Sequence, residues 1–176
     1  MSDSESSRRR FLKAATVAIG GAIGAVMTYP LLRYFFFPMS ARTVDSPEAP
    51  LDAIAADALE PGAPPVRVTL SADAVRDGWG VADNVPLGSA WVRRREDGEI
   101  EALSATCPHL GCAIDYDPDD GTFRCPCHKS VFDLDGERKT GPAKRGLDPL
   151  PHAVVDGRVK LTWVRYRADV AGREKV

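Results

Sequence analysis

The 176-residue sequence has no stripe of basic residues interleaved with aromatic residues, and Phe, Trp and Tyr together make up only 7% of it. Its formal net charge is −2, so neither sign of charge dominates the chain. Proteins that bind nucleic acid through a basic surface usually concentrate Lys and Arg on one face. Nucleic acid is therefore not an expected partner.

Cysteine and histidine are also scarce, with four Cys and three His in the whole chain. All four cysteines and two of the histidines nevertheless lie between residues 107 and 128, in two short boxes that read CPHLGC and CPCH. Free cysteines are usually scattered singly through a core. Their concentration here predicts a metal centre. The candidate residues are Cys107, His109, Cys112, Cys125, Cys127 and His128.

The spacing of these residues bears on the kind of metal centre. A structural zinc site usually draws on pairs such as C-x2-C or H-x3-5-H. Here the pairs are Cys107-x-His109 and Cys125-x-x-His128, with fifteen residues between them. One mixed pair on each of two loops suits a two-iron cluster, in which each loop supplies one thiolate to the inner iron and one imidazole to the outer iron. Zinc is the alternative.

With these boxes the chain resembles the Rieske iron–sulfur family, whose signature is C-x-H-x-G-C followed by C-P-C-H. Residues 107–112 match the first box and residues 125–128 match the second. The resemblance covers roughly the last hundred residues of the chain. It implies that the metal centre is a single Rieske-type [2Fe-2S] cluster.

The resemblance also implies a role for each ligand. Cys107 and Cys125 are expected on the inner iron, and His109 and His128 on the outer iron. Two imidazoles in place of two thiolates make the cluster less negative, which places its potential at roughly −150 to +300 mV. The second ring nitrogen of each histidine becomes more basic on reduction and can bind a proton. His109 and His128 are therefore the expected catalytic residues.

The family joins its two remaining cysteines, here Cys112 and Cys127, in a disulfide that ties the two cluster loops together. A structural disulfide implies an oxidising compartment, because such bonds seldom persist in a reducing cytosol. Two free buried thiols are the alternative.

Further positions can be compared with the family pattern. Ser130 keeps a serine that donates a hydrogen bond to a cluster sulfur, so it is an expected cofactor-binding residue. Phe132 stands where the family has a tyrosine, and Lys129 replaces a common glycine. Residues 141–143 (Gly-Pro-Ala) match the loop that covers the cluster, but Lys144 takes the place of its next proline.

The amino-terminal region resembles a twin-arginine export signal. Ser7 to Lys13 reads SRRRFLK, with Arg8 and Arg9 as the paired arginines. Ala14 to Leu32 follows without a charge, and nineteen helical residues span about 28 Å, close to the roughly 30 Å hydrocarbon core of a bilayer. No convincing small-x-small cleavage site follows. We therefore expect a retained anchor with its amino terminus inside, and a cleaved signal peptide is the alternative.

Four parts are expected along the chain: a signal region over 1–13, a transmembrane anchor over 14–37, a linker or hinge over 38–65, and a Rieske domain over 66–176. The linker is rich in proline, and one short helix is expected in it over residues 51–59. The domain is expected to be a small antiparallel β-sandwich, mainly β, with cluster-binding loops at about 105–145 grafted at one end. Strand-like runs occur at 66–70, 90–93, 100–103, 153–155 and 159–164.

The resemblance implies the Rieske subunit of a cytochrome bc-type quinol:cytochrome c oxidoreductase. Such a subunit accepts an electron from a membrane quinol, menaquinol or ubiquinol, and passes it to a c-type cytochrome. The expected partners are a cytochrome b-type subunit and a c-type cytochrome, in a dimeric complex. The expected location is the bacterial inner membrane, crossed once, with the Rieske domain on the periplasmic face.

Two other functions fit the cluster boxes. One is the Rieske subunit of another exported redox enzyme such as arsenite oxidase, in which a molybdenum subunit supplies the electron. The other is a soluble ferredoxin that serves an oxygenase. The predicted anchor and disulfide argue against the ferredoxin and do not separate the first two functions.

Overall fold

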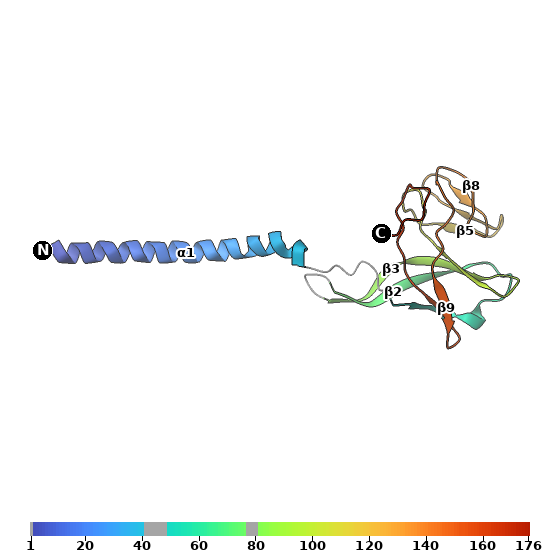
Figure 1. Ribbon diagram of the computed structural model, residues 1–176, viewed down its shortest axis with the longest axis horizontal. Helices are drawn as coiled ribbons and strands as arrows, with labels where there is room; N and C mark the ends of the chain where they lie inside the picture. The colour runs from blue at the N-terminus through green and yellow to red at the C-terminus, as the bar shows by residue number, and fades with distance from the viewer. Residues whose placement is uncertain (1, 41–48, 77–80) are drawn as a thin grey trace. The chain divides into compact units, whose positions relative to one another are not determined.

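The computed structural model of the protein describes residues 2–40, 49–76 and 81–176. The chain divides into an N-terminal helical unit and a larger β unit (Figure 1). Within the described residues one long helix precedes all of the strands, and every strand pair is antiparallel. The expected fold class, mainly β with one N-terminal apolar helix, is confirmed.

The helical unit consists of α1 (Ser2–Ser40). Within it, Ser7–Phe36 is long and apolar enough to cross a membrane. Large apolar side chains along this stretch are exposed, with 74% of Val17 and 73% of Val26 accessible. A helix with apolar side chains on all faces needs an apolar surrounding. The predicted anchor lies within this helix, whereas the twin-arginine signal at residues 8 and 9 stays a prediction.

The β unit holds three antiparallel sheets among the described residues, with the strand orders β1-β10-β9, β2-β3-β4 and β5-β6-β7-β8. A short 3-10 turn, η1 (Ala56–Ala58), follows the first strand. The strands are β1 (Leu51–Ala55), β2 (Val66–Arg76), β3 (Val81–Arg94), β4 (Ile100–Ser104), β5 (Asp115–Asp117), β6 (Thr122–Arg124), β7 (Val131–Phe132), β8 (Arg138–Thr140), β9 (His152–Val155) and β10 (Arg158–Leu161).

Two hydrophobic cores divide the β unit into a base and a cluster end. The base comprises β1–β4, β9 and β10, and its core includes Leu70, Val92, Val159 and Leu161, all fully buried. Val159 and Leu161 alternate along β10 with more accessible residues, as expected for a strand with one buried face. The second core belongs to the cluster end, which we define as residues 105–148 with sheet β5–β8.

Part of the segment predicted as a linker over 38–65 belongs to the β unit in the structure. Residues 51–59, predicted as a short helix, form strand β1 and the three-residue turn η1 instead, and Leu59 is buried in the base core. Strand β1 pairs with β10, and Asp52 forms an ion pair with Arg158. Pairing with a distant strand therefore overrides the helix propensity of this Ala-rich stretch. Residues 41–48 of the predicted linker lie outside the described residues.

The predicted strands at 66–70, 90–93, 100–103 and 153–155 are confirmed, and the strand predicted over 159–164 ends at Leu161. The β2–β3 pair is longer than predicted, because its register runs from Val66 opposite Val92 to Arg76 opposite Val81. Asp115 begins strand β5, and residues 118–121 form the turn that joins β5 to β6.

Candidate metal centre

The first cluster loop leaves the end of β4 and folds back on itself. Thr106 and Ala113 face each other in an isolated antiparallel bridge. Inside this bridge the Cys107 N–H donates to the Cys112 carbonyl at 2.8 Å, and the Gly111 N–H donates to the Cys107 carbonyl at 2.9 Å. Gly111 has φ +82°, a left-handed conformation that glycine adopts without steric cost. The box CPHLGC is therefore a closed loop that buries its first cysteine.

The second cluster loop connects β6 to β7 in the same way. The Cys125 N–H donates to the Ser130 carbonyl at 2.9 Å, and the Lys129 N–H donates to the Cys125 carbonyl at 3.1 Å. Lys129 has φ +57°, in the left-handed region. The glycine common in the family would suit this conformation, and a lysine costs roughly 1–2 kcal/mol more there. The backbone thus keeps the shape of the loop despite the substitution.

The two loops bring the predicted residues together in pairs. Cys107 and Cys125 are 1% and 3% exposed and interact through their side chains. The rings of His109 and His128 stand nearly perpendicular, with their centroids 4.9 Å apart. Each pair takes one member from each loop, as a shared metal centre requires.

Cys112 and Cys127 form a disulfide, as the family resemblance implies. Their sulfurs and the Cys125 sulfur all lie within 4.8 Å of one another. Because the disulfide uses two of these three sulfurs, Cys125 alone offers a thiol in this group. The bridge therefore ties the loops together beside the thiol pair.

The electrostatics of the pair fit a metal group. The pKa of the Cys107 thiol is raised to about 11, mainly by burial and also by the neighbouring Cys125 thiol, while hydrogen bonds from the backbone N–H groups of His109 and Leu110 act in the opposite direction. The buried Cys107 thiol is therefore neutral at pH 7 unless a cation compensates the charge of its thiolate.

His109 supplies a second sign of a metal site. Its Nδ1 atom is buried and has no hydrogen-bond partner within the part of the chain that the structure describes. A buried polar atom left unpaired costs about 1–3 kcal/mol. A metal bound at Nδ1 removes this cost. The His109 side chain is half-buried and His128 is exposed, so the histidines lie on the solvent side of the thiols.

Two buried residues follow Cys125 along the chain: Ser130 at the end of the second loop and Phe132 in β7. Ser130 is fully buried, and its hydroxyl oxygen accepts a hydrogen bond from the Ala143 N–H at 3.2 Å. A hydroxyl that accepts one bond can still donate its own hydrogen, as the predicted bond to a cluster sulfur requires. Phe132 is fully buried in the core that contains Cys107 and Cys125.

The comparison with known proteins decides the family. A sequence model of the Rieske [2Fe-2S] domain matches residues 58–151. The chain belongs to the Rieske family. The donor set of this Rieske protein, two buried thiols and two nearby imidazoles, fits the [2Fe-2S] cluster of that family.

Curated relatives of this Rieske protein share almost its whole length. It is 35% identical to the menaquinol:cytochrome c reductase iron-sulfur subunit of Geobacillus thermodenitrificans over 93% of this chain and 95% of that one. It is 32% identical to the Bacillus subtilis protein of the same name, over 88% and 90% of the two chains. Among solved structures, the plasma membrane Rieske protein of Synechocystis PCC 6803 aligns with 65% of this chain and 99% of its own, at 23% identity and a TM-score of 0.43.

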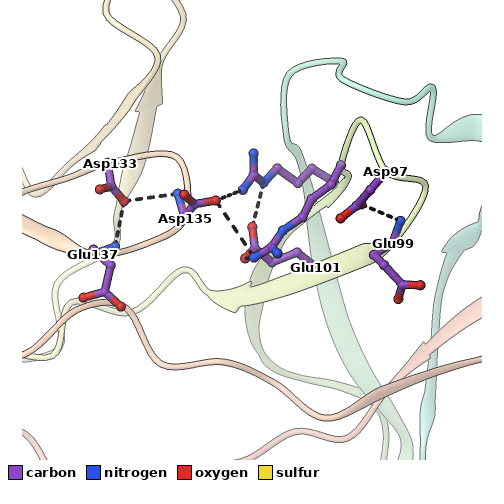
Figure 2. Close-up of polar contacts among 8 residues, drawn as sticks. Asp97, Glu99, Glu101, Asp133, Asp135 and Glu137 are labelled. Carbon is purple, nitrogen blue, oxygen red and sulfur yellow. Dashed lines mark hydrogen bonds and ion pairs between the residues drawn. The ribbon is translucent and has the colours of Figure 1, made fainter.

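Ion pairs hold the cluster end of the Rieske protein on the base, as Figure 2 shows. The Asp133 carboxylate accepts the N–H groups of Asp135 and Glu137, which closes the turn between β7 and β8. The Asp135 carboxylate pairs with Arg93, and Arg93 pairs at 2.6 Å with Glu101, its partner across β3 and β4. The network fixes the position of β7, the strand that follows the second cluster loop.

The sequence did not predict that residues near the carboxyl terminus contact both the first cluster loop and the loop over residues 141–144, which we call the cover loop. The Asp169 N–H donates to the Pro108 carbonyl at 2.9 Å, and Lys144 donates to Asp169. The available signal was Lys144 itself, which stands where the family pattern has a proline.

Proposed function

We propose that this Rieske protein is the iron–sulfur subunit of a quinol:cytochrome c reductase, which takes an electron from membrane menaquinol and passes it to a c-type cytochrome. Its partners are a cytochrome b-type subunit and a c-type cytochrome, in a dimeric complex. The similarity to the Geobacillus subunit over 95% of that protein supports this proposal.

The observation that carries the site assignment is the unpaired, buried Nδ1 of His109 beside two buried thiols. We assign Cys107 and Cys125 as inner-iron ligands and His109 and His128 as outer-iron ligands. When bound, a [2Fe-2S] cluster supplies reversible one-electron transfer. The protein supplies two thiols that are buried away from water, and two imidazoles that a quinol can reach from solvent.

The histidines are placed to handle the proton. If Nδ1 of His109 binds metal, Nε2 is the nitrogen left to accept the hydrogen bond of a quinol hydroxyl. The exposure of His128 makes its ring accessible in the same way. A quinol gives up protons with its electrons, so a proton acceptor beside the electron acceptor serves quinol oxidation.

The proposed function also implies where the protein lies in the cell. The helix segment Ser7–Phe36 anchors the chain in the inner membrane, and the β unit lies on the periplasmic face. Arg8 and Arg9 direct export by the twin-arginine route, which carries folded proteins and so allows cluster insertion before export. A disulfide between Cys112 and Cys127 agrees with this oxidising location.

Phe132→Tyr is expected to raise the midpoint potential, because the family tyrosine at this position donates a hydrogen bond to the cluster. A bond stronger by about 1 kcal/mol in the reduced state raises the potential by about 40 mV. Ser130→Ala, which removes a donor, is expected to lower it. Redox titration followed by electron paramagnetic resonance measures both shifts.

Phe123→Tyr is the control for an added hydroxyl. Phe123 is a buried residue opposite Phe132 across β6 and β7, and its ring lies against Trp91 and Tyr116. The Phe123→Tyr variant is expected to keep the wild-type midpoint potential. An unchanged potential in folded Phe132→Tyr protein would contradict the inference that the missing hydroxyl at position 132 lowers the midpoint potential.

Purification of the full chain from membranes through a carboxyl-terminal tag tests the function. We expect a haem-containing cytochrome b-type subunit to co-purify and the complex to reduce a c-type cytochrome with a menaquinol analogue. His128→Ala should abolish that activity without releasing the subunit. Co-purification with a molybdenum subunit, or the absence of haem, would contradict the proposal.

A further inference from the structure

The last residues of the chain form a hairpin, which we call the C-terminal hairpin (residues 165–176). Tyr166 and Lys175 pair in an antiparallel bridge, the Arg167 N–H donates to the Glu174 carbonyl at 2.8 Å, and the Val176 N–H donates to the Arg165 carbonyl at 3.0 Å. In Figure 1 this dark red segment loops back beside the end of the β unit that carries β5 and β8.

One residue of the hairpin connects two loops of the metal centre. The Asp169 N–H donates at 2.9 Å to the carbonyl of Pro108, which lies between Cys107 and His109. The Lys144 ammonium, at the end of the cover loop, donates to the Asp169 carbonyl at 2.8 Å and to its carboxylate at 3.1 Å. Asp169 therefore bridges the first cluster loop and the cover loop.

A buried ion pair anchors the hairpin behind this bridge. The Arg145 guanidinium is 5% exposed and binds both carboxylate oxygens of Asp148, at 2.8 and 2.7 Å. Its remaining terminal nitrogen donates to the Val170 carbonyl at 2.7 Å, one residue after Asp169. Arg173 adds a bond to the Leu147 carbonyl at 3.3 Å. A planar guanidinium fixed on one side by a carboxylate presents its other donors in a set direction.

Lys144, which stands where the family pattern has a proline, explains why the cover loop is linked to the hairpin. A proline at this position would limit the cover loop through its fixed φ. A lysine leaves the backbone freer and offers instead a long side chain with three donors. The ammonium reaches Asp169, so a cross-link to the C-terminal hairpin restrains the loop that a proline would otherwise stiffen.

We propose that the C-terminal hairpin is a clamp on the metal centre, and that Asp169 is a positioning residue within it. Asp169 holds the Pro108 carbonyl and the Lys144 ammonium, and so fixes the separation of the first cluster loop from the cover loop. This proposal rests on the ligand assignment of the proposed function, because Pro108 lies between two of the assigned ligands. The clamp slows cluster loss by keeping the cover closed over Ser130 and the buried thiols.

Asp169→Gly tests the side-chain arm of the clamp. Asp169 has φ +56°, so glycine removes the carboxylate without left-handed strain. In the full chain, purified in detergent with its cluster, we expect cluster loss to an iron chelator to become about two- to threefold faster, as for the loss of one exposed ion pair. Lys144→Met, which removes both bonds of the ammonium, should give about a fivefold increase.

Asp52→Ala is the matched control. Asp52 and Arg158 form an ion pair in the base, and their side chains are 50% and 46% exposed, against 49% and 52% for Asp169 and Lys144. This variant is expected to lose its cluster at the wild-type rate. An equal acceleration in Asp52→Ala and Asp169→Gly would show a general stability effect and overturn the clamp.

Double variants make the test specific. With Lys144→Met, Asp169→Gly should cause no additional acceleration, because the carboxylate that Asp169→Gly removes contacts the ammonium that Lys144→Met has already removed. Lys144→Pro should restore slow cluster loss in the Asp169→Gly protein. Additive effects, or unchanged cluster loss in both single variants, would overturn the clamp. The ligand assignment is tested separately, by loss of the electron paramagnetic resonance signal in a ligand variant such as His109→Ala. A wrong ligand assignment and a wrong clamp proposal can therefore be told apart.

Discussion

Replacing His109 with alanine is expected to abolish the Rieske-type electron paramagnetic resonance signal while the β unit stays folded. The Nδ1 atom of His109 is buried and unpaired among the described residues, so the imidazole adds no hydrogen bond at this atom that the fold would lose. The side chain is half-buried, and its ring lies edge-on to the ring of His128, at 4.9 Å between centroids. The loss should therefore fall on metal binding.

The third histidine is the matched control. His152 lies in β9 of the base, is exposed, and contacts the Leu150 carbonyl at 3.2 Å. His152→Ala should keep the full resonance signal. Analysis of iron, sulfide and zinc in the wild-type protein decides between a two-iron cluster and a zinc site, the two kinds of metal centre considered from the spacing. A signal retained in His109→Ala, or zinc without iron, would refute the ligand assignment.

The metal centre could be predicted from sequence because its donors lie in two short local boxes. Each box forms a loop closed by its own backbone bonds, from Cys107 to Cys112 and from Cys125 to Ser130. Short-range turns carry strong sequence signals, such as the left-handed Gly111. The conformation at Lys129 also follows from the loop closure, although the residue itself opposes it.

The parts that were missed depend on long-range pairing. Strand β1 exists because β10 accepts it as a neighbour, and the Asp52–Arg158 pair joins residues 106 positions apart. An Ala-rich stretch such as residues 51–59 carries no local mark of that partner. The bond from Asp169 to Pro108 is of the same kind, since a loop residue in an exposed hairpin shows no periodicity.

Gly141→Ala is expected to disrupt the cover over the metal centre and lower the thermal unfolding temperature of the β unit by about 10 °C. A Cβ at this position would lie 2.4 Å from the Ser130 Cα and 2.8 Å from its backbone nitrogen. These are backbone atoms of the second cluster loop, so they cannot move aside as a flexible side chain can. Gly141 also has φ +96°, which alanine rarely adopts. Clash and strain together cost about 3 kcal/mol.

Gly121→Ala separates the clash from the strain. Gly121 lies in the turn before β6 with φ +63°, but a Cβ there meets no atom within 4 Å. Its cost is the left-handed strain alone, about 1 kcal/mol. Gly141→Ala should therefore be clearly less stable than Gly121→Ala and should lose its cluster faster, because the Ala143 N–H and the Ser130 hydroxyl are pushed apart. Equal unfolding temperatures would mean that the cover loop moves away without cost, and that close packing of Gly141 on Ser130 does not hold the metal centre closed.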